Sequence, residues 1–193
     1  MIIKNAKFET SVADPSKYSS TRSEIAFVGR SNVGKSSLLN MLCGNSKLAR
    51  TSSTPGRTRL INYFLINNEF YFVDLPGYGY AKATKSIIEG WQGLLEPYLI
   101  DNPNLKLVCV LVDSRITPTD QDKQMINYLA YYNIPFVVAA TKVDKYAKSK
   151  ISPALVKIAN ELGLGKANVI GVSSENKYGK DVLLNTMQVF LNN

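Results

Sequence analysis

The sequence of 193 residues contains no histidine and only two cysteines, Cys43 and Cys109. Without histidine, the chain cannot build a Ser-His-Asp triad, a histidine–zinc site or a catalytic histidine base. The cysteines fall in a predicted helix and a predicted strand, where we interpret them as small core residues in a reducing cytosol. Any reaction must therefore run on a metal ion, lysine, backbone amides and water.

Long hydrophobic runs are also missing. No stretch approaches the roughly 18 apolar residues of a membrane span, and Met1–Asn5 lacks the apolar region of a signal peptide. We therefore expect a cytoplasmic protein without a membrane partner. The length suits one domain, which we place at residues 23–193. Residues 1–22 are a short extension with a candidate edge strand at Ile2–Phe8.

Acidic residues are in the minority, because 15 Asp and Glu face 23 Lys and Arg, for a formal net charge of +8. This excess favours an anionic partner, with nucleic acid the leading candidate. A nucleotide-binding protein also needs positive charge for its own ligand, and solvated lysines are common. Composition alone leaves these explanations open.

A phosphate-loop pattern, G-x-x-x-x-G-K-S, is present as Gly29-Arg30-Ser31-Asn32-Val33-Gly34-Lys35-Ser36, with Ser37 behind it. A predicted strand precedes it and a predicted helix follows, so backbone N–H groups should face a phosphate. Gly29 and Gly34 would let the backbone approach an anion where a Cβ would obstruct. Lys35 can bind the β/γ oxygens, and the Ser36 hydroxyl can ligate Mg²⁺. An ordinary glycine-rich βα turn is the alternative interpretation.

Hydrophobic runs alternate with amphipathic ones, which predicts an α/β, three-layer P-loop NTPase fold of the Ras-like G-domain type. The Asn67-Asn68 turn signal predicts an antiparallel pair over Arg59–Asp74. We expect a six-stranded, mostly parallel sheet with one antiparallel strand and helices on both faces. The predicted strands are Ile25–Val28, Arg59–Ile66, Phe70–Asp74, Leu107–Val112, Phe136–Ala140 and Val169–Val172; the predicted helices are Ser36–Cys43, Ser86–Leu99, Gln121–Tyr131, Pro153–Leu162 and Lys180–Leu191.

A second phosphate-side motif, Asp74-Leu75-Pro76-Gly77, closes the third predicted strand. An aspartate at a strand end can hold Mg²⁺ through water, and the Gly77 N–H can sense the γ-phosphate. Asp113 also ends a hydrophobic strand and competes for this role. We prefer Asp74, because the following Pro-Gly places a backbone N–H near the phosphate. Asp113, followed by Ser114-Arg115, is expected to fix the next loop.

A base-recognition motif, Thr141-Lys142-Val143-Asp144, follows an apolar run. The Asp144 carboxylate can accept hydrogen bonds from N1–H and the 2-amino group of guanine, whereas adenine offers neither donor. The Lys142 stem can cover the face of the base. Val172-Ser173-Ser174 ends the last predicted strand, where the Ser174 N–H can reach the guanine O6.

These motifs together resemble a small GTPase of the TrmE-Era-EngA-EngB-septin-like class, and in finer detail the EngB (YihA/YsxC) family. The stretches that carry the resemblance are Gly29–Ser37, Ala49–Thr58, Phe72–Ala81 and Gln121-Asp122, and the resemblance covers roughly residues 22–191. It implies a bacterial GTPase that uses GTP/GDP and Mg²⁺. It also implies a role in assembly of the large ribosomal subunit, traditionally described under cell division and septation.

The resemblance also selects a switch threonine. Asn45–Thr58 is a long polar stretch without a helix or strand pattern, and such loops are usually functional. Residue chemistry alone does not choose among Thr51, Thr54 and Thr58, but the family pattern Pro-Gly-x-Thr makes Thr58 the Mg²⁺ ligand beside Ser36 and Asp74. The loop residues then expected around the nucleotide are Gly56, Arg57, Thr58, Arg59 and Leu60.

Hydrolysis would proceed without the glutamine that often follows Asp-x-x-Gly, because Tyr78 stands there. A phenol is a poor substitute for orienting water, so we expect slow intrinsic turnover. We hypothesise that Asn32 helps bind a K⁺ that bridges the phosphates in place of an arginine finger. Asn32 tying the phosphate loop to the first switch loop is an equally weighted alternative. The expected catalytic residues are Lys35, Thr58, Gly77 and Asn32, while nothing in the sequence places Arg30, Arg57 or Arg59 at the γ-phosphate.

Basic and aromatic residues accumulate in or beside the two predicted switch loops, a combination that suits RNA. They are Arg50, Arg57, Arg59, Lys82, Lys85, Tyr63, Tyr78 and Tyr80. We expect the large ribosomal subunit, through its rRNA, to bind this switch-side surface. The alternative is that Tyr63 packs within its sheet and the charges are solvated.

Two other functions stay open. One is a hydrolase of the nucleotide pool, against which the solitary domain and long switch loop argue. The other is a septation or cytoskeletal GTPase that acts without a ribosome. The chain shows no obvious self-association stripe, so we expect a monomer.

Overall fold

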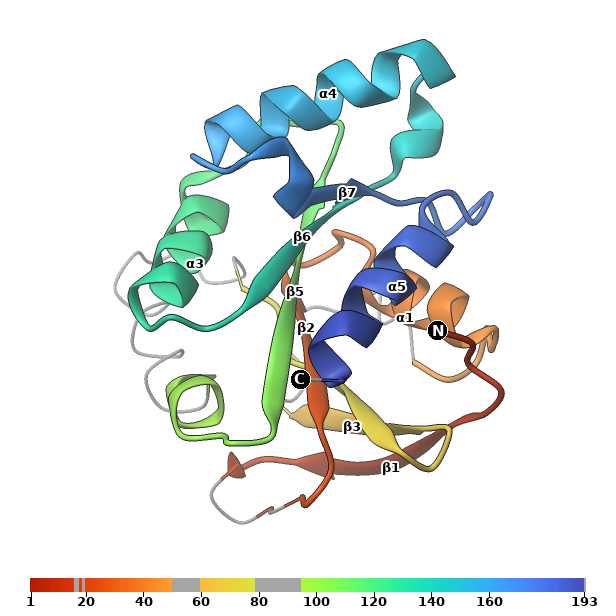
Figure 1. Ribbon diagram of the computed structural model, residues 1–193, viewed down its shortest axis with the longest axis vertical. Coiled ribbons are helices and arrows are strands. Elements are labelled where there is room, and N and C mark those ends of the chain that lie inside the picture. The colour runs from red at the N-terminus through yellow and green to blue at the C-terminus, as the bar shows by residue number, and fades with distance from the viewer. Residues whose placement is uncertain (16–17, 19, 50–59, 79–94, 193) are drawn as a thin grey trace.

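The computed structural model describes residues 1–15, 18, 20–49, 60–78 and 95–192. Figure 1 shows one sheet with helices on either side of it. In the described part, the sheet has seven strands in the order β1-β3-β4-β2-β5-β6-β7. They are β1 (Ala6–Val12), β2 (Glu24–Gly29), β3 (Ile61–Ile66), β4 (Phe70–Asp74), β5 (Leu105–Asp113), β6 (Phe136–Thr141) and β7 (Val169–Gly171).

The helices with printed bounds alternate with these strands as the sequence predicts. They are α1 (Lys35–Cys43), α3 (Asp120–Tyr131), α4 (Lys148–Glu161) and α5 (Lys180–Leu191), with short 3₁₀ turns η2 (Val143–Lys145) and η3 (Lys166–Asn168). Of the helix predicted over Ser86–Leu99, residues 95–99 are described and are helical, and the helix continues to residue 100. Among the residues with described structure, no helix has the length and apolar character to cross a membrane.

One strand runs against all the others. β3 is antiparallel to both β1 and β4, whereas β2, β4, β5, β6 and β7 pair in parallel. The predicted Asn67-Asn68 hairpin turn is confirmed: both residues have left-handed backbone, with φ of 52° and 58°, and Glu69 donates its N–H to the Ile66 carbonyl at 2.9 Å.

The strand count of six was wrong, because the chain's first segment adds β1 to the edge of the sheet. The edge strand lies at Ala6–Val12 rather than Ile2–Phe8. Residues Lys4 and Asn5 donate their backbone N–H groups to the side chain of Asn67, at 2.8 and 3.2 Å. Their N–H groups are therefore bonded to the hairpin turn, and pairing of the first segment with β3 starts only at Ala6.

Each face of the sheet has its own hydrophobic core, which gives the three layers. Along β2, Ala26 and Val28 face one core with α3 and α4, while Ile25 and Phe27 face the other with α1 and α5. This alternation follows from the two-residue period of a strand, so a central strand buried on both faces is apolar throughout. Cys109 is buried in the second core and Cys43 packs at its edge, both as free thiols.

Helix α4 begins at Lys148, five residues before the predicted start at Pro153. Proline favours the first turn of a helix, which explains the prediction. Ile151 and Ile158 are both buried, and they lie seven residues apart on one helical face. Packing of this face against the sheet therefore keeps the chain helical on both sides of Pro153.

Candidate nucleotide-binding site

The phosphate loop joins the end of β2 to the start of α1. Gly34 precedes the helix with φ of 104°, a left-handed backbone that requires glycine although a Cβ there would meet nothing within 4 Å. At Gly29, a Cβ would lie 3.0 Å from Leu111 of β5 and from Val33. Both glycines are thus required by the protein's own backbone and packing, and their predicted role in letting an anion approach stays a prediction.

Lys35 and Asp74 form an ion pair between the first residue of α1 and the last residue of β4. Both side chains are largely buried, with 14% and 13% of their surface exposed. Ser36 follows Lys35 in the first turn of α1 and is half-buried, while Ser37 is exposed. The structure thus brings together three of the residues that the sequence predicts for phosphate and Mg²⁺.

The oxygen donors at this point suit Mg²⁺, which prefers hard oxygen ligands and keeps several from water and phosphate. Ser36 offers a hydroxyl and Asp74 a carboxylate. In the part of the chain that the structure describes, no group of three or more acidic or cysteine side chains could hold a metal by itself. A Mg²⁺ held here would therefore take its remaining ligands from the nucleotide and water.

The segment after Asp74 lies along the phosphate loop. Leu75 donates its N–H to the Phe27 carbonyl at 3.0 Å. Tyr78 donates its N–H to the Gly29 carbonyl, and its own carbonyl accepts from the Ser31 N–H, each at 3.2 Å. Arg30 and Tyr78 form an isolated parallel bridge. The half-buried Pro76 and exposed Gly77 lie between these bonds, and a Cβ on Gly77 would stand 3.1 Å from the Gly29 carbonyl. Gly77 is thereby held beside the loop.

The Tyr78 phenol points away from solvent and is 2% exposed. Its hydroxyl donates to Asp122 Oδ1 at 2.8 Å. Burial and the neighbouring Asp122 carboxylate raise the pKa of Tyr78 far above its ordinary range, so the phenol stays a neutral donor. Tyr78 therefore ties the segment that follows Gly77 to α3, a role that the sequence did not predict.

Asp122 serves two structures at once. While Oδ1 accepts from Tyr78, Oδ2 accepts from the backbone N–H and the hydroxyl of Thr119, each at 2.8 Å, in a capping box at the start of α3. The sequence held a signal for the cap, a threonine three residues before an acid. It held none for the bond to Tyr78.

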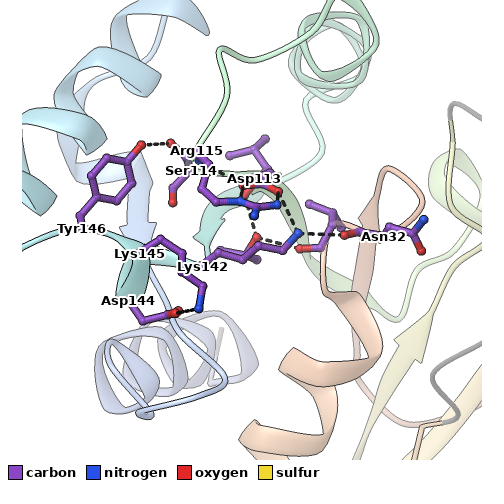
Figure 2. Close-up of polar contacts among 11 residues, drawn as sticks. Asn32, Asp113, Ser114, Arg115, Lys142, Asp144, Lys145 and Tyr146 are labelled. Carbon is purple, nitrogen blue, oxygen red and sulfur yellow. Dashed lines mark hydrogen bonds and ion pairs between the residues drawn. The ribbon is translucent and has the colours of Figure 1, made fainter. Parts of the chain in front are cut away.

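The base-recognition loop is bonded to the phosphate loop. The Thr141 hydroxyl at the end of β6 donates to the Val33 carbonyl at 2.7 Å. The Lys142 ammonium donates to the Asn32 carbonyl at 3.0 Å and to Asp113 Oδ2 at 2.8 Å, as Figure 2 shows. Loops from β2, β5 and β6 therefore converge at one ammonium group.

Asp144 lies half-buried in η2 and meets the loop after β7. Its Oδ1 accepts from the Ser173 hydroxyl at 2.7 Å, and its Oδ2 pairs with Lys145 at 3.0 Å. The hydrogen bond from Ser173, aided by Lys145, holds the pKa of Asp144 below its ordinary value. Val143, Val172 and Ser173 are buried, and Ser174 is half-buried beside them.

Asp113 behaves as predicted, because its carboxylate fixes the loop that follows β5. Arg115 donates Nε to Oδ1 at 2.9 Å and Nη2 to Oδ2 at 2.8 Å, and its backbone N–H reaches Oδ1 at 3.1 Å. The prediction did not include the additional bond from Lys142. No local pattern reveals it, since the two residues are separated by 29 positions.

The expected RNA surface is only partly described. Tyr63 is 2% exposed and packs against Tyr18 and Tyr71, with ring centroids 4.4 and 5.7 Å apart, so its expected role in RNA contact was wrong and the alternative of packing in the sheet is confirmed. Leu60 is half-buried just before β3. The other residues predicted for this surface or for the switch loop lie outside the described residues: Arg50, Gly56, Arg57, Thr58, Arg59, Tyr80, Lys82 and Lys85.

Comparison with known proteins gives a consistent result. A family model described as 50S ribosome-binding GTPase matches residues 24–142. The chain is 50% identical to a probable GTP-binding protein EngB of Clostridium kluyveri, over 97% of this chain and 96% of that one. It is 46% identical to the Fusobacterium nucleatum protein of the same description, over 100% of both chains.

Solved structures show the same fold. The crystal structure of a probable GTP-binding protein EngB matches with a TM-score of 0.73 at 24% identity, over 88% of this chain and 99% of that one. The structure of Era in complex with MgGDPNP and nucleotides of 16S ribosomal RNA matches with a TM-score of 0.64 at 26% identity, over 87% and 56% of the chains.

Proposed function

Since the chain belongs to the EngB family of GTP-binding proteins and is a GTPase, we propose that it acts as a nucleotide-dependent switch in assembly of the large ribosomal subunit. We place this activity in the cytoplasm, with a role needed for normal cell division and septation. The observation that carries the nucleotide site is the junction of three loops at Lys142 and Thr141. The ribosomal partner is supported by the description of the matching family, a 50S ribosome-binding GTPase.

We assign the phosphates to Gly29–Ser37, whose backbone turns into the N-terminus of α1. When bound, Mg²⁺ neutralises charge that builds on the β- and γ-phosphate oxygens. Ser36, Asp74 and Thr58 would hold it. Lys35 would exchange its bond to Asp74 for phosphate oxygens, which frees the carboxylate for the metal's water shell.

We assign recognition of the guanine base to Asp144. The stem of Lys142 would cover the face of the base, and the Ser174 N–H would donate to the guanine O6. The lowered pKa keeps Asp144 ionised, which makes both carboxylate oxygens acceptors for guanine donors. One oxygen already accepts from Ser173, and this bond orients the carboxylate. An adenine base would leave the acceptor unmatched.

We propose slow intrinsic hydrolysis, because the residue after Gly77 is committed to Asp122 and does not orient water. Asn32 remains our candidate for a K⁺ ligand: its carbonyl binds Lys142, while its side-chain amide points away from Lys142 in Figure 2. Turnover measured in KCl and NaCl at equal ionic strength tests this point. We expect faster turnover in KCl, and equal rates would exclude K⁺ activation.

Co-sedimentation with purified 50S particles tests the ribosomal assignment. We expect more protein to pellet with GTP or a non-hydrolysable analogue than with GDP, and the bound fraction to fall steeply with salt. Equal pelleting in both nucleotides would contradict a switch. GTP-dependent pelleting without ribosomes would instead favour a polymerising septation or cytoskeletal GTPase.

A further inference from the structure

The Asp113–Arg115 ion pair has more hydrogen bonds and a less exposed carboxylate than an ordinary surface ion pair. Arg115 makes two side-chain bonds and one backbone bond to a carboxylate that is 13% exposed. Burial alone would raise the pKa of Asp113, but the bonds from Arg115 and Lys142 outweigh it and hold the pKa far below its ordinary value. Asp113 is therefore a fixed negative charge in a fixed orientation.

The Asp113 carboxylate contacts a flexible cation, the side chain of Lys142. A lysine side chain has four rotatable bonds and loses rotamer entropy when it is held in one place. Lys142 is held nonetheless, by Asp113 Oδ2 at 2.8 Å and by the Asn32 carbonyl at 3.0 Å, with 28% of its side chain exposed. Only Asp113 provides it with a full opposite charge among these partners.

The loops that carry these residues are tied at further points. The Tyr146 hydroxyl donates to the Ser114 carbonyl at 2.6 Å, on the other side of Asp113 from the phosphate loop. Figure 2 shows the resulting row, from Tyr146 and Ser114 through Arg115 and Asp113 to Lys142 and Asn32. The position of Lys142 therefore depends on the loop after β5 as well as on its own loop.

We infer that Asp113 and Arg115 are positioning residues for guanine-nucleotide binding, because they hold the Lys142 ammonium on the Asn32 carbonyl and so keep its stem where the base packs. The inference rests on the proposed assignment of Lys142 to the base. Arg115 orients Asp113, Asp113 holds Lys142, and Lys142 joins the base loop to the phosphate loop. Neither Asp113 nor Arg115 needs to touch the nucleotide.

Dissociation of fluorescent GDP and of a fluorescent non-hydrolysable GTP analogue tests the inference. Asp113→Asn should speed dissociation of both about tenfold, the usual effect of losing a hydrogen bond to a charged group. The two nucleotides should respond equally, because the base is common to both. Arg115→Ala should have a smaller effect in the same direction, and Arg115→Lys should restore part of it. Lys123→Ala, which breaks the exposed Lys123–Glu161 pair of 3.3 Å, is the matched control and should change nothing.

A double-mutant cycle separates positioning from a general structural role. If Asp113 acts through Lys142, Asp113→Asn should add less than about twofold in a Lys142→Ala background. Full additivity would overturn the inference, as would wild-type dissociation from both Asp113→Asn and Arg115→Ala. The Arg115 side chain is 48% exposed, so Arg115→Ala carries the test if Asp113→Asn fails to fold.

A parallel measurement on Asp144→Asn separates this inference from the proposed site. If Asp144→Asn loses guanine preference while the Asp113 and Arg115 variants bind normally, the inference fails and the site stands. If the wild-type protein shows no guanine preference, both fail.

Discussion

The base side and the phosphate side of the site are held together by different kinds of contact. On the base side, Asp113, Lys142 and Asp144 each have side-chain partners in other parts of the site. On the phosphate side, backbone bonds hold Tyr78 along the loop, and the Lys35–Asp74 pair joins two residues that both have proposed tasks toward the ligand.

This difference indicates where nucleotide binding requires rearrangement. The base-side contacts can persist when guanine binds, so binding costs little free energy for ordering side chains there. On the phosphate side of the proposed site, Lys35 and Asp74 would exchange their mutual bond for bonds to phosphate and metal-bound water. The proposed site would thus recognise the base with a preformed surface and respond to the phosphates by exchange of contacts, as the proposed switch function requires.

The largest expected effect comes from removing the carboxylate that is proposed to bind guanine on the base side. Asp144→Asn replaces the acceptor pair with an amide, and we expect guanine-nucleotide affinity to fall by at least about a hundredfold while xanthosine triphosphate gains. Competition binding with both triphosphates measures the change. Asp181→Asn, an exposed acid in the first turn of α5, is the control. Unchanged guanine preference would refute the assignment.

The next effect addresses the phosphate side. Lys35→Ala removes the ammonium from the β/γ oxygens, so we expect GTP affinity to fall by roughly tenfold or more and GDP affinity to fall less. Isothermal titration with each nucleotide measures the difference. Lys47→Ala removes an exposed charge near the end of α1 and controls for net charge. An equal loss for GDP and GTP would show that Lys35 does not read the γ-phosphate.

A smaller effect concerns the bond between the second switch segment and α3. Tyr78→Phe removes the donor to Asp122 and leaves a buried carboxylate oxygen with one partner fewer. We expect the free energy of unfolding to fall by about 1 kcal/mol, with GDP affinity little changed. Urea denaturation measures the stability, with Tyr178→Phe as the control because that ring is 43% exposed. Unaltered stability would mean that the bond contributes nothing.

The smallest expected effect concerns how guanine-nucleotide affinity at the base side depends on pH. Ser173→Ala removes the bond that lowers the pKa of Asp144, so the pKa should rise toward its ordinary value. Only the ionised carboxylate accepts both guanine donors, and affinity is lost as pH falls through this pKa. The loss should therefore begin at a higher pH in the variant. Ser174→Ala should leave the profile unchanged, because Ser174 is assigned through its backbone. Identical profiles would count against the role of Ser173.

Sequence reasoning succeeded where local pattern determines structure. The phosphate-loop turn and the Asn67-Asn68 hairpin are each set within a few residues, and the apolar β2 signals a strand buried on both faces. It failed where a side chain could face either of two environments. Side chains along a strand point alternately to its two faces, so the sequence alone leaves the side of Tyr63 open. Its contacts with the rings of Tyr18 and Tyr71 show that it faces the core.

The candidate site divides in the same way. Motif spacing was enough to select Lys35, Asp74 and Asp144 as candidates, and the structure places Lys35 against Asp74 and Asp144 against Ser173. The bond from Tyr78 to Asp122 spans 44 positions, and the bond from Lys142 to Asp113 spans 29. Such contacts follow from the packing of elements against one another, which a single sequence does not reveal.

The shared carboxylate of Asp122 also sets a limit on signalling through α3. A movement of Tyr78 changes one of the hydrogen bonds that this carboxylate accepts, while Thr119 keeps the other oxygen engaged. One such bond is worth about 1 kcal/mol, which corresponds to roughly a fivefold change in an equilibrium constant. If the protein is the proposed switch, α3 would therefore respond to its state with a graded bias rather than an all-or-none change, and a binding partner that touches both elements would be needed to amplify the response.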